Sequence, residues 1–376
     1  MIYFDNAATS YPKPQSVYRA ASLASANAYG NPGRSGHTPS MRAARVLFET
    51  REALAEFFGA ETENVAFTLN CTHALNLAVK GILEGGGHAI TSSLEHNSVL
   101  RPLHALSLKG NARYDIARVE NDDEATLQNF RAALRPDTKA VVCTLASNVT
   151  GQILPFREIG RLCAERGICF IADGAQACGI LPVSLKDGIN ILCAAGHKGL
   201  FGLMGTGFLA TDGKFPIKST MEGGTGSNSK EVLQPDFMPD LLESGTPNTP
   251  GIASLGAGLA FVERYGLNKR LQHEQKLCTQ LIEGLRRIPG VHAFPRGKGS
   301  YAPIVSFAFE RIPSSSAASL LDQEGFALRG GFHCAGLVHE ALGTEENGLV
   351  RFAPSVFNTP AQVSGLLAAV KKSAGR

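Results

Sequence analysis

One lysine and one aspartate stand in the surroundings that cofactor chemistry requires. Lys198 lies in the small-residue run 194–199, and Asp173 stands 25 positions earlier, at the end of the apolar run 168–172. An amine among small residues can hold pyridoxal phosphate covalently, and an acid can keep the pyridine nitrogen protonated so that the ring acts as an electron sink. A His-Lys pair in a glycine-rich loop is weak evidence alone. The acid-ended strand makes pyridoxal phosphate chemistry the leading hypothesis.

The segments around this pair alternate between strand-like and helix-like patterns. The strand-like runs are nearly unbroken apolar stretches, which is typical of a parallel sheet covered on both faces. The alternation predicts a doubly wound α/β domain. The predicted strands are 65–69, 88–91, 140–145, 168–172, 189–194 and 207–210. A helix is predicted before them over 40–58, and the helices predicted between them are 73–83, 98–108 and 156–165.

The C-terminal third predicts a second, smaller lobe. A turn-rich segment, 223–250, leads to a linking helix near 252–265. After it we expect helices over 267–287 and 315–324, a strand over 303–309, short strands near residues 327 and 349, and a final helix over 361–372. Thr38-Pro39 and Thr359-Pro360 are typical helix starts, with threonine as the cap and proline in the first turn.

Composition excludes several classes of protein. The chain has 376 residues, is 44% hydrophobic and 18% charged, and carries a formal net charge of only +3 without a Lys/Arg block, which argues against nucleic-acid binding. The start of the chain has no secretory signal pattern, and no run approaches 18 apolar residues, so no membrane span is expected. The eight cysteines show no CxxC pair and no zinc-like spacing. They indicate no metal site and fit a reducing cytoplasm.

Several further motifs follow one another in order along the chain. They are Phe-Asp-Asn-Ala-Ala-Thr at 4–9, Cys-Thr-His-Ala-Leu-Asn at 71–76, Leu-Glu-His-Asn-Ser at 94–98, Ala-Ser-Asn-Val-Thr-Gly at 146–151 and Arg-Gly-Gly-Phe-His-Cys-Ala at 329–335. With Lys198 and Asp173 they resemble the class V aminotransferase-like family of pyridoxal phosphate enzymes. Within that family the chain is most similar to the cysteine desulfurases of the group II, SUF-type and selenocysteine-lyase-like branch. The resemblance runs nearly from end to end.

The resemblance implies a fold. It is the fold-type-I architecture, with a large domain built on a mainly parallel, seven-stranded type of sheet and a smaller α+β C-terminal domain. We expect the large cofactor-binding domain to span residues 15–255, and the small domain to combine residues 1–14 with 256–376.

The resemblance also implies the residues that hold the cofactor. Lys198 attaches it, Asp173 faces the pyridine nitrogen and Gln176 lies near the phenolic oxygen. Phosphate contacts are implied for Thr72 and His73, at a helix N-terminus where backbone N–H groups favour anions, and for His197. Ala195 departs from the pattern, because this branch usually has a serine there, so other donors must replace that contact. Thr246 matches a threonine that reaches the phosphate of a partner subunit, which implies a homodimer.

Further residues are implied on the substrate side. His96 matches the histidine that stacks on the cofactor ring, where it can also relay protons. Asn148 matches the asparagine that touches the cofactor oxygen and the substrate carboxylate. Arg351 matches the arginine that takes the α-carboxylate as a two-pronged ion pair. Arg34 and His37 match an active-site loop, where Arg34 is a candidate substrate ligand and His37 has no assigned role.

Cys334 decides the expected reaction. The segment 329–335 resembles the Arg-x-Gly-x-His-Cys-Ala loop that carries the catalytic cysteine of group II desulfurases. We expect Arg329 and His333 to lower the pKa of the thiol and make it nucleophilic, with Arg329 also near the substrate. The implied reaction converts L-cysteine to L-alanine and leaves sulfur on Cys334 as a persulfide, which then passes to an acceptor protein for iron–sulfur or thiolated products.

Three other interpretations stay open from the sequence. A selenocysteine lyase or a cysteine-sulfinate desulfinase would use the same cofactor on a related substrate, with less need for Cys334. Another class V aminotransferase or a racemase-like enzyme is a more distant option, against which the Cys334 motif argues. A non-catalytic scaffold of the same fold would have no reason to keep Lys198, Asp173 and His96 together.

Overall fold

The centre of the molecule is a seven-stranded sheet. The computed structural model describes residues 1–28, 30–33, 35–294, 297 and 299–375. The strand order is β2-β8-β7-β6-β5-β3-β4, and β8 alone runs antiparallel to its neighbours. The bounds are β2 Val65–Thr68, β3 His88–Ser92, β4 Arg113–Ala117, β5 Thr138–Thr144, β6 Cys169–Asp173, β7 Ile191–Ala195 and β8 Gly207–Thr211. The predicted mainly parallel sheet is confirmed.

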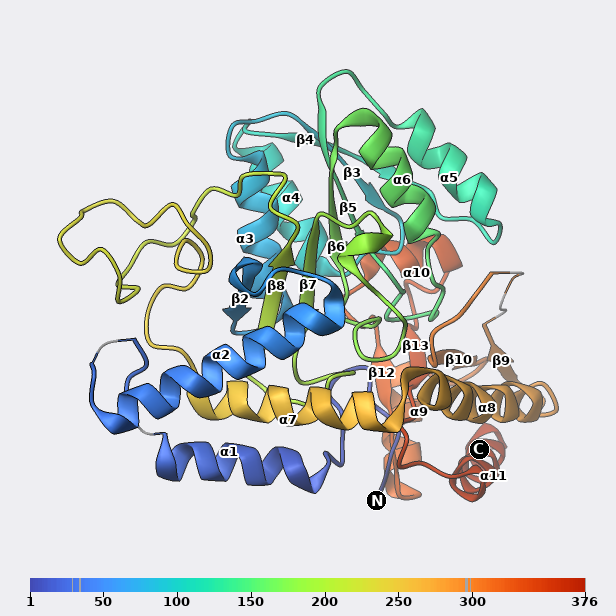
Figure 1. The fold of residues 1–376 in the computed structure, drawn as a ribbon. Coiled ribbons are helices and arrows are strands. Elements are labelled where there is room, and N and C mark those ends of the chain that lie inside the picture. Colours follow the sequence, from blue (N-terminus) through green and yellow to red (C-terminus); the bar gives the residue numbers. More distant parts are fainter. Residues whose placement is uncertain (29, 34, 295–296, 298, 376) are drawn as a thin grey trace.

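Helices cover this sheet on both faces (Figure 1). On one face α3 (Cys71–Leu83) and α4 (Asn97–Leu108) pack on each other and on the sheet. Helices α1 (Gln15–Asn27), α2 (Thr38–Phe58) and α7 (Thr249–Tyr265) form a second group, and α5 (Asp123–Ala132) and α6 (Phe156–Arg166) pack together. Two short 3₁₀ turns, Thr62–Asn64 and Leu185–Asp187, complete this part.

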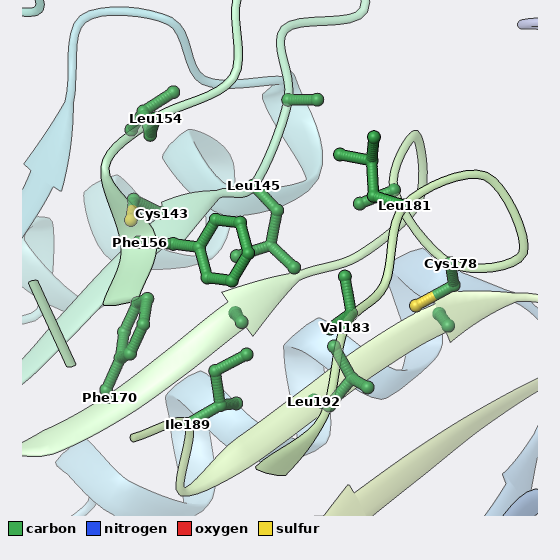
Figure 2. Close-up of a cluster of buried hydrophobic side chains, with 14 of the residues drawn as sticks. Cys143, Leu145, Leu154, Phe156, Phe170, Cys178, Leu181, Val183, Ile189 and Leu192 are labelled. Atoms are coloured by element: carbon green, nitrogen blue, oxygen red, sulfur yellow. The ribbon is translucent and has the colours of Figure 1, made fainter. Parts of the chain in front are cut away.

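Alternate residues of each central strand enter two different cores. In β6, Phe170 and Ala172 belong to one cluster, whereas Cys169 and Ile171 belong to the other. Figure 2 shows part of the first cluster, where Phe170 lies near Phe156 and Ile189. Because both faces of the sheet are buried, the strand has no polar side, and this explains the unbroken apolar runs in the sequence.

A four-stranded antiparallel sheet organises the second lobe. Its order is β12-β13-β10-β9, with bounds β9 Val291–Ala293, β10 Val305–Phe309, β12 Arg329–Gly331 and β13 Leu349–Phe352. Its helices are α8 Leu267–Leu285, α9 Ser314–Gln323, α10 Gly336–Leu342 and α11 Pro360–Ala374. The start of the chain joins this lobe: β1 (Ile2–Tyr3) pairs with β11 (Phe326–Ala327), and Phe4 lies in the lobe's core.

The structure corrects several details of the sequence prediction. The predicted strands and helices are present with ends shifted by a few residues, but the helices α1, α5 and α10 and the strands β1, β4, β9 and β12 were not predicted. The cap of α2 is His37, whose Nδ1 accepts the Ser40 N–H at 3.3 Å, and Thr38 is already helical. Thr359 does cap α11, in a reciprocal arrangement with Gln362.

The division into domains stays a prediction. The proposed boundary at residue 255 falls inside α7, which packs along α1 and α2. In the described part of the chain, no helix combines the length and the apolar character that crossing a membrane requires.

Candidate active site

The ends of two neighbouring strands bring Lys198 and Asp173 together. Strand β6 ends at Asp173, and the parallel strand β7 ends at Ala195, three residues before Lys198. Carboxyl ends of parallel strands share one edge of a sheet, which is where ligands bind in open α/β folds. A cleft at this edge is lined by both residues and by Thr72, His96, Asn148, Gln176, Ala195 and His197. The structure therefore gathers most of the predicted cofactor residues in one place.

Asp173 is held so that one carboxylate oxygen stays open to the cleft. Its side chain is buried, and its Oδ1 accepts the Ala175 N–H at 2.9 Å and the Cys71 thiol at 3.3 Å. Among the described residues, no hydrogen bond ends on Oδ2. That oxygen can therefore accept the proton of a pyridine nitrogen.

The Lys198 amine is tuned by two opposing effects. Burial lowers its pKa, and the neighbouring Asp173 carboxylate partly opposes this shift. Desolvation disfavours the charged ammonium, so a larger fraction of the amine is neutral. A neutral amine is what both carbonyl attachment and proton abstraction require.

The N-terminus of α3 forms one wall of the cleft. Asn70 caps the helix by accepting the His73 N–H at 2.9 Å, and the Thr72 hydroxyl lies 2.7 Å from that of Ser98. His197 also lines the cleft, and its Nδ1 is buried without a partner among the described residues. Burial lowers the pKa of His197 to about 4, so its ring is neutral at pH 7.

Two expected cofactor ligands have other surroundings within this chain. The His73 ring turns back, so that its Nδ1 accepts the Leu69 N–H at 3.3 Å, and it lines a neighbouring groove rather than the cleft. Thr246 is exposed, accepts the Asn31 side-chain amide at 3.3 Å and lines that same groove. Arg34 lies outside the described residues, and His37 serves as the α2 cap.

His96 is fixed by its position as the cap of α4. Its Nδ1 accepts the Ser98 N–H at 3.1 Å and lies 2.8 Å from the Ser98 hydroxyl. Burial lowers the pKa of His96, which favours a neutral ring. Ser98 therefore touches both His96 and Thr72. No role was predicted for Ser98 from the sequence, although it belongs to the motif at 94–98.

Gln176 and Asn148 are held by contacts with distant parts of the chain. The Gln176 amide donates to the Ala7 carbonyl at 3.0 Å. The Asn148 amide donates to the His333 carbonyl at 2.8 Å, and its Oδ1 is buried without a partner among the described residues. Asn148 also lines the cleft.

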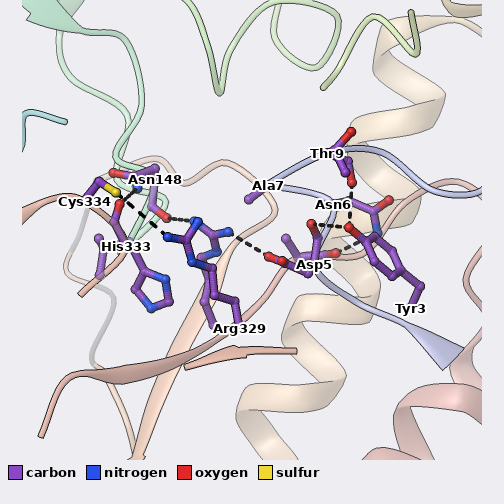
Figure 3. A network of polar contacts seen from close by, with 12 residues as sticks. Tyr3, Asp5, Asn6, Ala7, Thr9, Asn148, Arg329, His333 and Cys334 are labelled. Atoms are coloured by element: carbon purple, nitrogen blue, oxygen red, sulfur yellow. Dashed lines mark hydrogen bonds and ion pairs between the residues drawn. The ribbon is translucent and has the colours of Figure 1, made fainter. Parts of the chain in front are cut away.

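The antiparallel register of the second lobe places two arginines opposite each other. Arg329 on β12 pairs with Arg351 on β13. Arg351 is buried, and it donates from Nη1 to the Asn148 carbonyl at 2.9 Å and from Nη2 to Asp5 at 2.8 Å. Its Nε is buried and, within the described chain, unpartnered. Figure 3 shows this network, with Asp5 on one side and Asn148 on the other.

Cys334 lies at the exposed edge of this network. It is the one cysteine of eight that is exposed, and its sulfur is 3.9 Å from Arg329 Nη2. Both His333 and Cys334 have left-handed backbone angles, with φ of 52° and 57°. Two such non-glycine residues in succession are rare and indicate a constrained turn. The Asn97 N–H donates to the Cys334 carbonyl at 2.8 Å and ties this turn to α4.

His333 does not approach the sulfur as the sequence suggested. Its ring points away from the Cys334 sulfur (Figure 3), and its Nε2 donates to the Leu349 carbonyl at 2.9 Å. Burial lowers the pKa of His333 to about 2. The ring is therefore neutral, and of the two residues expected to act on the thiol, only Arg329 brings a positive charge to it.

The buried His333 predicts a pH-dependent stability. The unfolded chain binds a proton near pH 6.5, whereas the folded chain does not, so folding stability falls as pH drops below about 6.5. When the pH is lowered from 7 to 5, this group should reduce the unfolding free energy of the wild type by about 2 kcal/mol. The unfolding free energy of His333→Gln should fall correspondingly less over that pH interval. Urea unfolding of both proteins at several pH values measures the difference, and parallel pH profiles would contradict the prediction.

The comparisons with known proteins agree with this geometry. The family model described as class-V aminotransferase matches residues 2–366. The chain belongs to the class-V aminotransferase family. A probable cysteine desulfurase of Pyrococcus abyssi is 32% identical over 99% of this chain and 94% of its own length, and one of Methanothermobacter thermautotrophicus is 30% identical over 100% and 95%.

Solved structures of this family are similar over the whole chain. The apo structure of a cysteine desulfurase from Thermococcus onnurineus NA1 superposes with a TM-score of 0.92 at 30% identity, covering 100% of this chain and 94% of the other. The cysteine desulfurase CsdA from Escherichia coli gives a TM-score of 0.87 at 25% identity, covering 99% and 94%. The predicted fold-type-I architecture is thereby confirmed.

The cofactor of this class-V family is pyridoxal 5'-phosphate, and the cleft fits it. Asp173 Oδ2 is open for the pyridine nitrogen. The buried, unpartnered His197 Nδ1 and Asn148 Oδ1 are polar atoms that a ligand would satisfy. The roles of the individual residues stay predictions.

Proposed function

We propose that this protein is a cysteine desulfurase that uses pyridoxal phosphate. It would convert L-cysteine to L-alanine and carry the sulfur on Cys334. One observation carries this proposal: the exposed Cys334 lies beside Arg329. The Cys334 carbonyl accepts the backbone N–H of Asn97, the first residue of α4, which directly follows the cleft residue His96. The relatives named cysteine desulfurase, at 30–32% identity over the full length, support it.

The residues of the cleft have separate roles in the proposed reaction. When bound, the cofactor withdraws electrons from the substrate α-carbon. Arg351 and Asn148 would hold the α-carboxylate, because Arg351 Nε still lacks a partner in the described structure and the Asn148 amide, which gives one hydrogen to the His333 carbonyl, has a second to donate. Asp5 already neutralises Arg351, so the incoming carboxylate shares or displaces that ion pair. Lys198, with its lowered pKa, would take up the α-proton.

Cys334 performs the step that distinguishes this reaction. Its thiolate attacks the substrate sulfur, a new S–S bond forms, and the C–S bond breaks. The electron pair of that bond goes to the substrate carbon, which is protonated on the way to alanine. Arg329 Nη2, at 3.9 Å, stabilises the attacking thiolate.

Product analysis tests this function against its alternatives. Purified holoenzyme is given L-cysteine, L-selenocysteine or L-cysteine sulfinate, and sulfide, selenide, sulfite and alanine are measured. We expect alanine from L-cysteine in a one-to-one ratio with sulfide when a reducing thiol is present. Turnover of selenocysteine or the sulfinate alone would favour the lyase or desulfinase interpretation, and amino transfer to a keto acid would favour an aminotransferase.

We further propose that the enzyme is a homodimer. A groove of about 630 Å³ contains Thr246 and His73, together with the exposed apolar side chains of Phe48, Leu69 and Met221. Apolar groups at 41–61% exposure in one groove are typical of an interaction surface. A second copy covering this groove could bring its own Thr246 to the cofactor phosphate of the first.

The proposed dimer predicts that Thr246 contributes to cofactor binding. Thr246→Ala should raise the cofactor dissociation constant about ten-fold, because one hydrogen bond to a charged phosphate is lost. Light scattering at micromolar concentration should give twice the mass of the 376-residue chain. A monomer that binds cofactor tightly would rule the arrangement out.

We also propose that the enzyme works in a reducing compartment. All eight cysteines are free thiols, and seven of them are buried. This fits a reducing cytoplasm, where sulfur from Cys334 would pass to an acceptor protein for iron–sulfur or thiolated products.

A further inference from the structure

A second hollow lies beside the cofactor cleft, on the outer side of His96. It encloses about 400 Å³ between α3, α4 and the Cys334 loop. Cys334 is part of its wall, and His96 lines both this hollow and the cofactor cleft. Lys80, in the last turn of α3, and Arg101, in α4, line it too. We name this space the acceptor hollow, defined by Lys80, His96, Arg101 and Cys334.

The acceptor hollow is positively charged. None of its ten lining residues is acidic, and within the described chain neither Lys80 nor Arg101 forms an ion pair. Burial lowers the pKa of His96, which favours a neutral ring, so the ring adds no charge to the hollow at neutral pH. Lys80 is half-buried and Arg101 is exposed, and both line the hollow. The hollow therefore attracts anions toward Cys334.

The role of this charge follows from the proposed function, on which the inference rests. A persulfide on Cys334 must be consumed before the next turnover. An acceptor thiolate attacks its outer sulfur, a new S–S bond forms on the acceptor, and the old S–S bond breaks with its electron pair returning to the Cys334 thiolate. The outer sulfur atom is transferred from Cys334 to the acceptor without any external oxidant or reductant.

We propose that the acceptor hollow receives a thiol that carries carboxylate groups. Lys80 and Arg101 bind the carboxylates while the thiolate reaches the outer sulfur of the Cys334 persulfide. The substrate has its own carboxylate ligand in Arg351, which does not line this hollow, so the two anions use separate sites. Lys80 and Arg101 are specificity-determining residues for the second half of the reaction.

Matched small thiols test the charge preference. Holoenzyme is loaded with one equivalent of L-cysteine, and the persulfide on Cys334 is quantified by mass spectrometry. Mercaptosuccinate, 2-mercaptoethanol and cysteamine are then mixed with it, and the rate of persulfide loss is followed. Each rate is divided by that of the same thiol with a small free disulfide, which removes differences in intrinsic nucleophilicity. We expect mercaptosuccinate to exceed cysteamine by roughly ten-fold at low ionic strength, and the ratio to approach one in 1 M salt.

Charge removal at the two cations is the decisive variant. In Lys80→Met with Arg101→Met, the apolar stems stay but the charges are lost, and the preference for mercaptosuccinate should vanish. Lys109→Met is the control, because Lys109, the C-terminal cap of α4, lies about 12 Å from Arg101 along the helix axis and does not line the hollow. It should keep the preference. Rates in all variants are expressed per persulfide formed.

Short peptides distinguish the two sources of such a thiol. A peptide with cysteine between aspartates is compared with one that has cysteine between lysines. If the acidic peptide is preferred, a protein cysteine among acidic residues is the acceptor; if mercaptosuccinate alone is preferred, a free thiol is. A persulfide that reacts equally with all three small thiols overturns the inference and leaves the desulfurase function intact. No persulfide on Cys334 overturns the proposed function itself.

Discussion

Lys198→Ala is expected to lower turnover of L-cysteine by at least about 10³-fold, because one side chain serves two steps. Its amine would attach the cofactor and would also move the α-proton of the substrate. The lowered pKa of Lys198 supplies the neutral amine for both tasks. The variant should also lose the yellow absorbance of covalently held cofactor, although it can still trap cofactor without a bond.

A labelling experiment identifies the lysine directly. Borohydride reduction of the wild-type holoenzyme followed by tryptic digestion should place the cofactor mass on the peptide containing Lys198. Lys13 is the informative rival, because it is buried, its pKa is lowered to about 8 and its Nζ lies 3.3 Å from the His197 carbonyl. Label on Lys13 would overturn the assignment. The exposed Lys214→Ala serves as the control for activity.

The central sheet was predictable because its physical cause is local. A strand buried on both faces must be apolar at every position, and runs such as 168–172 state this directly. Strand β4 was missed because it is the edge of the sheet and its residues are partly exposed. The seven-residue α10 gives too short a pattern to predict, and its buried Val338 packs into the core cluster of the large sheet, against residues distant in the sequence.

The candidate site was predictable where a motif carries it and unpredictable where register creates it. Lys198, Asp173 and His96 were found from their neighbours in the sequence. The opposition of Arg329 and Arg351 depends on how β12 and β13 align, and the ion pair between Asp5 and Arg351 joins the two ends of the chain. The orientation of His333 is set by the Leu349 carbonyl, a backbone atom that no side-chain pattern reports.

Cys334→Ala should abolish turnover of L-cysteine, with a loss of at least about 100-fold, because sulfur bound to carbon is a poor leaving group without a nucleophile. Cofactor binding and the first spectral change on adding L-cysteine should persist, since they depend on Lys198 and Arg351. Selenium leaves more readily, so the same variant should keep more of any activity toward selenocysteine. Comparing the two substrates in one variant separates a loss of nucleophile from a loss of fold.

The position of the persulfide provides the matched test. After a single turnover of the wild type, mass spectrometry should find one added sulfur on the peptide containing Cys334. Cys71 is the rival, since its thiol also lines the cleft, but burial and Asp173 raise its pKa well above the ordinary value and keep it protonated. A protonated thiol is a poor nucleophile, so Cys71→Ala should still form the persulfide on Cys334. Added sulfur on Cys71, or wild-type desulfuration by Cys334→Ala, would mean that the persulfide mechanism is wrong for this chain.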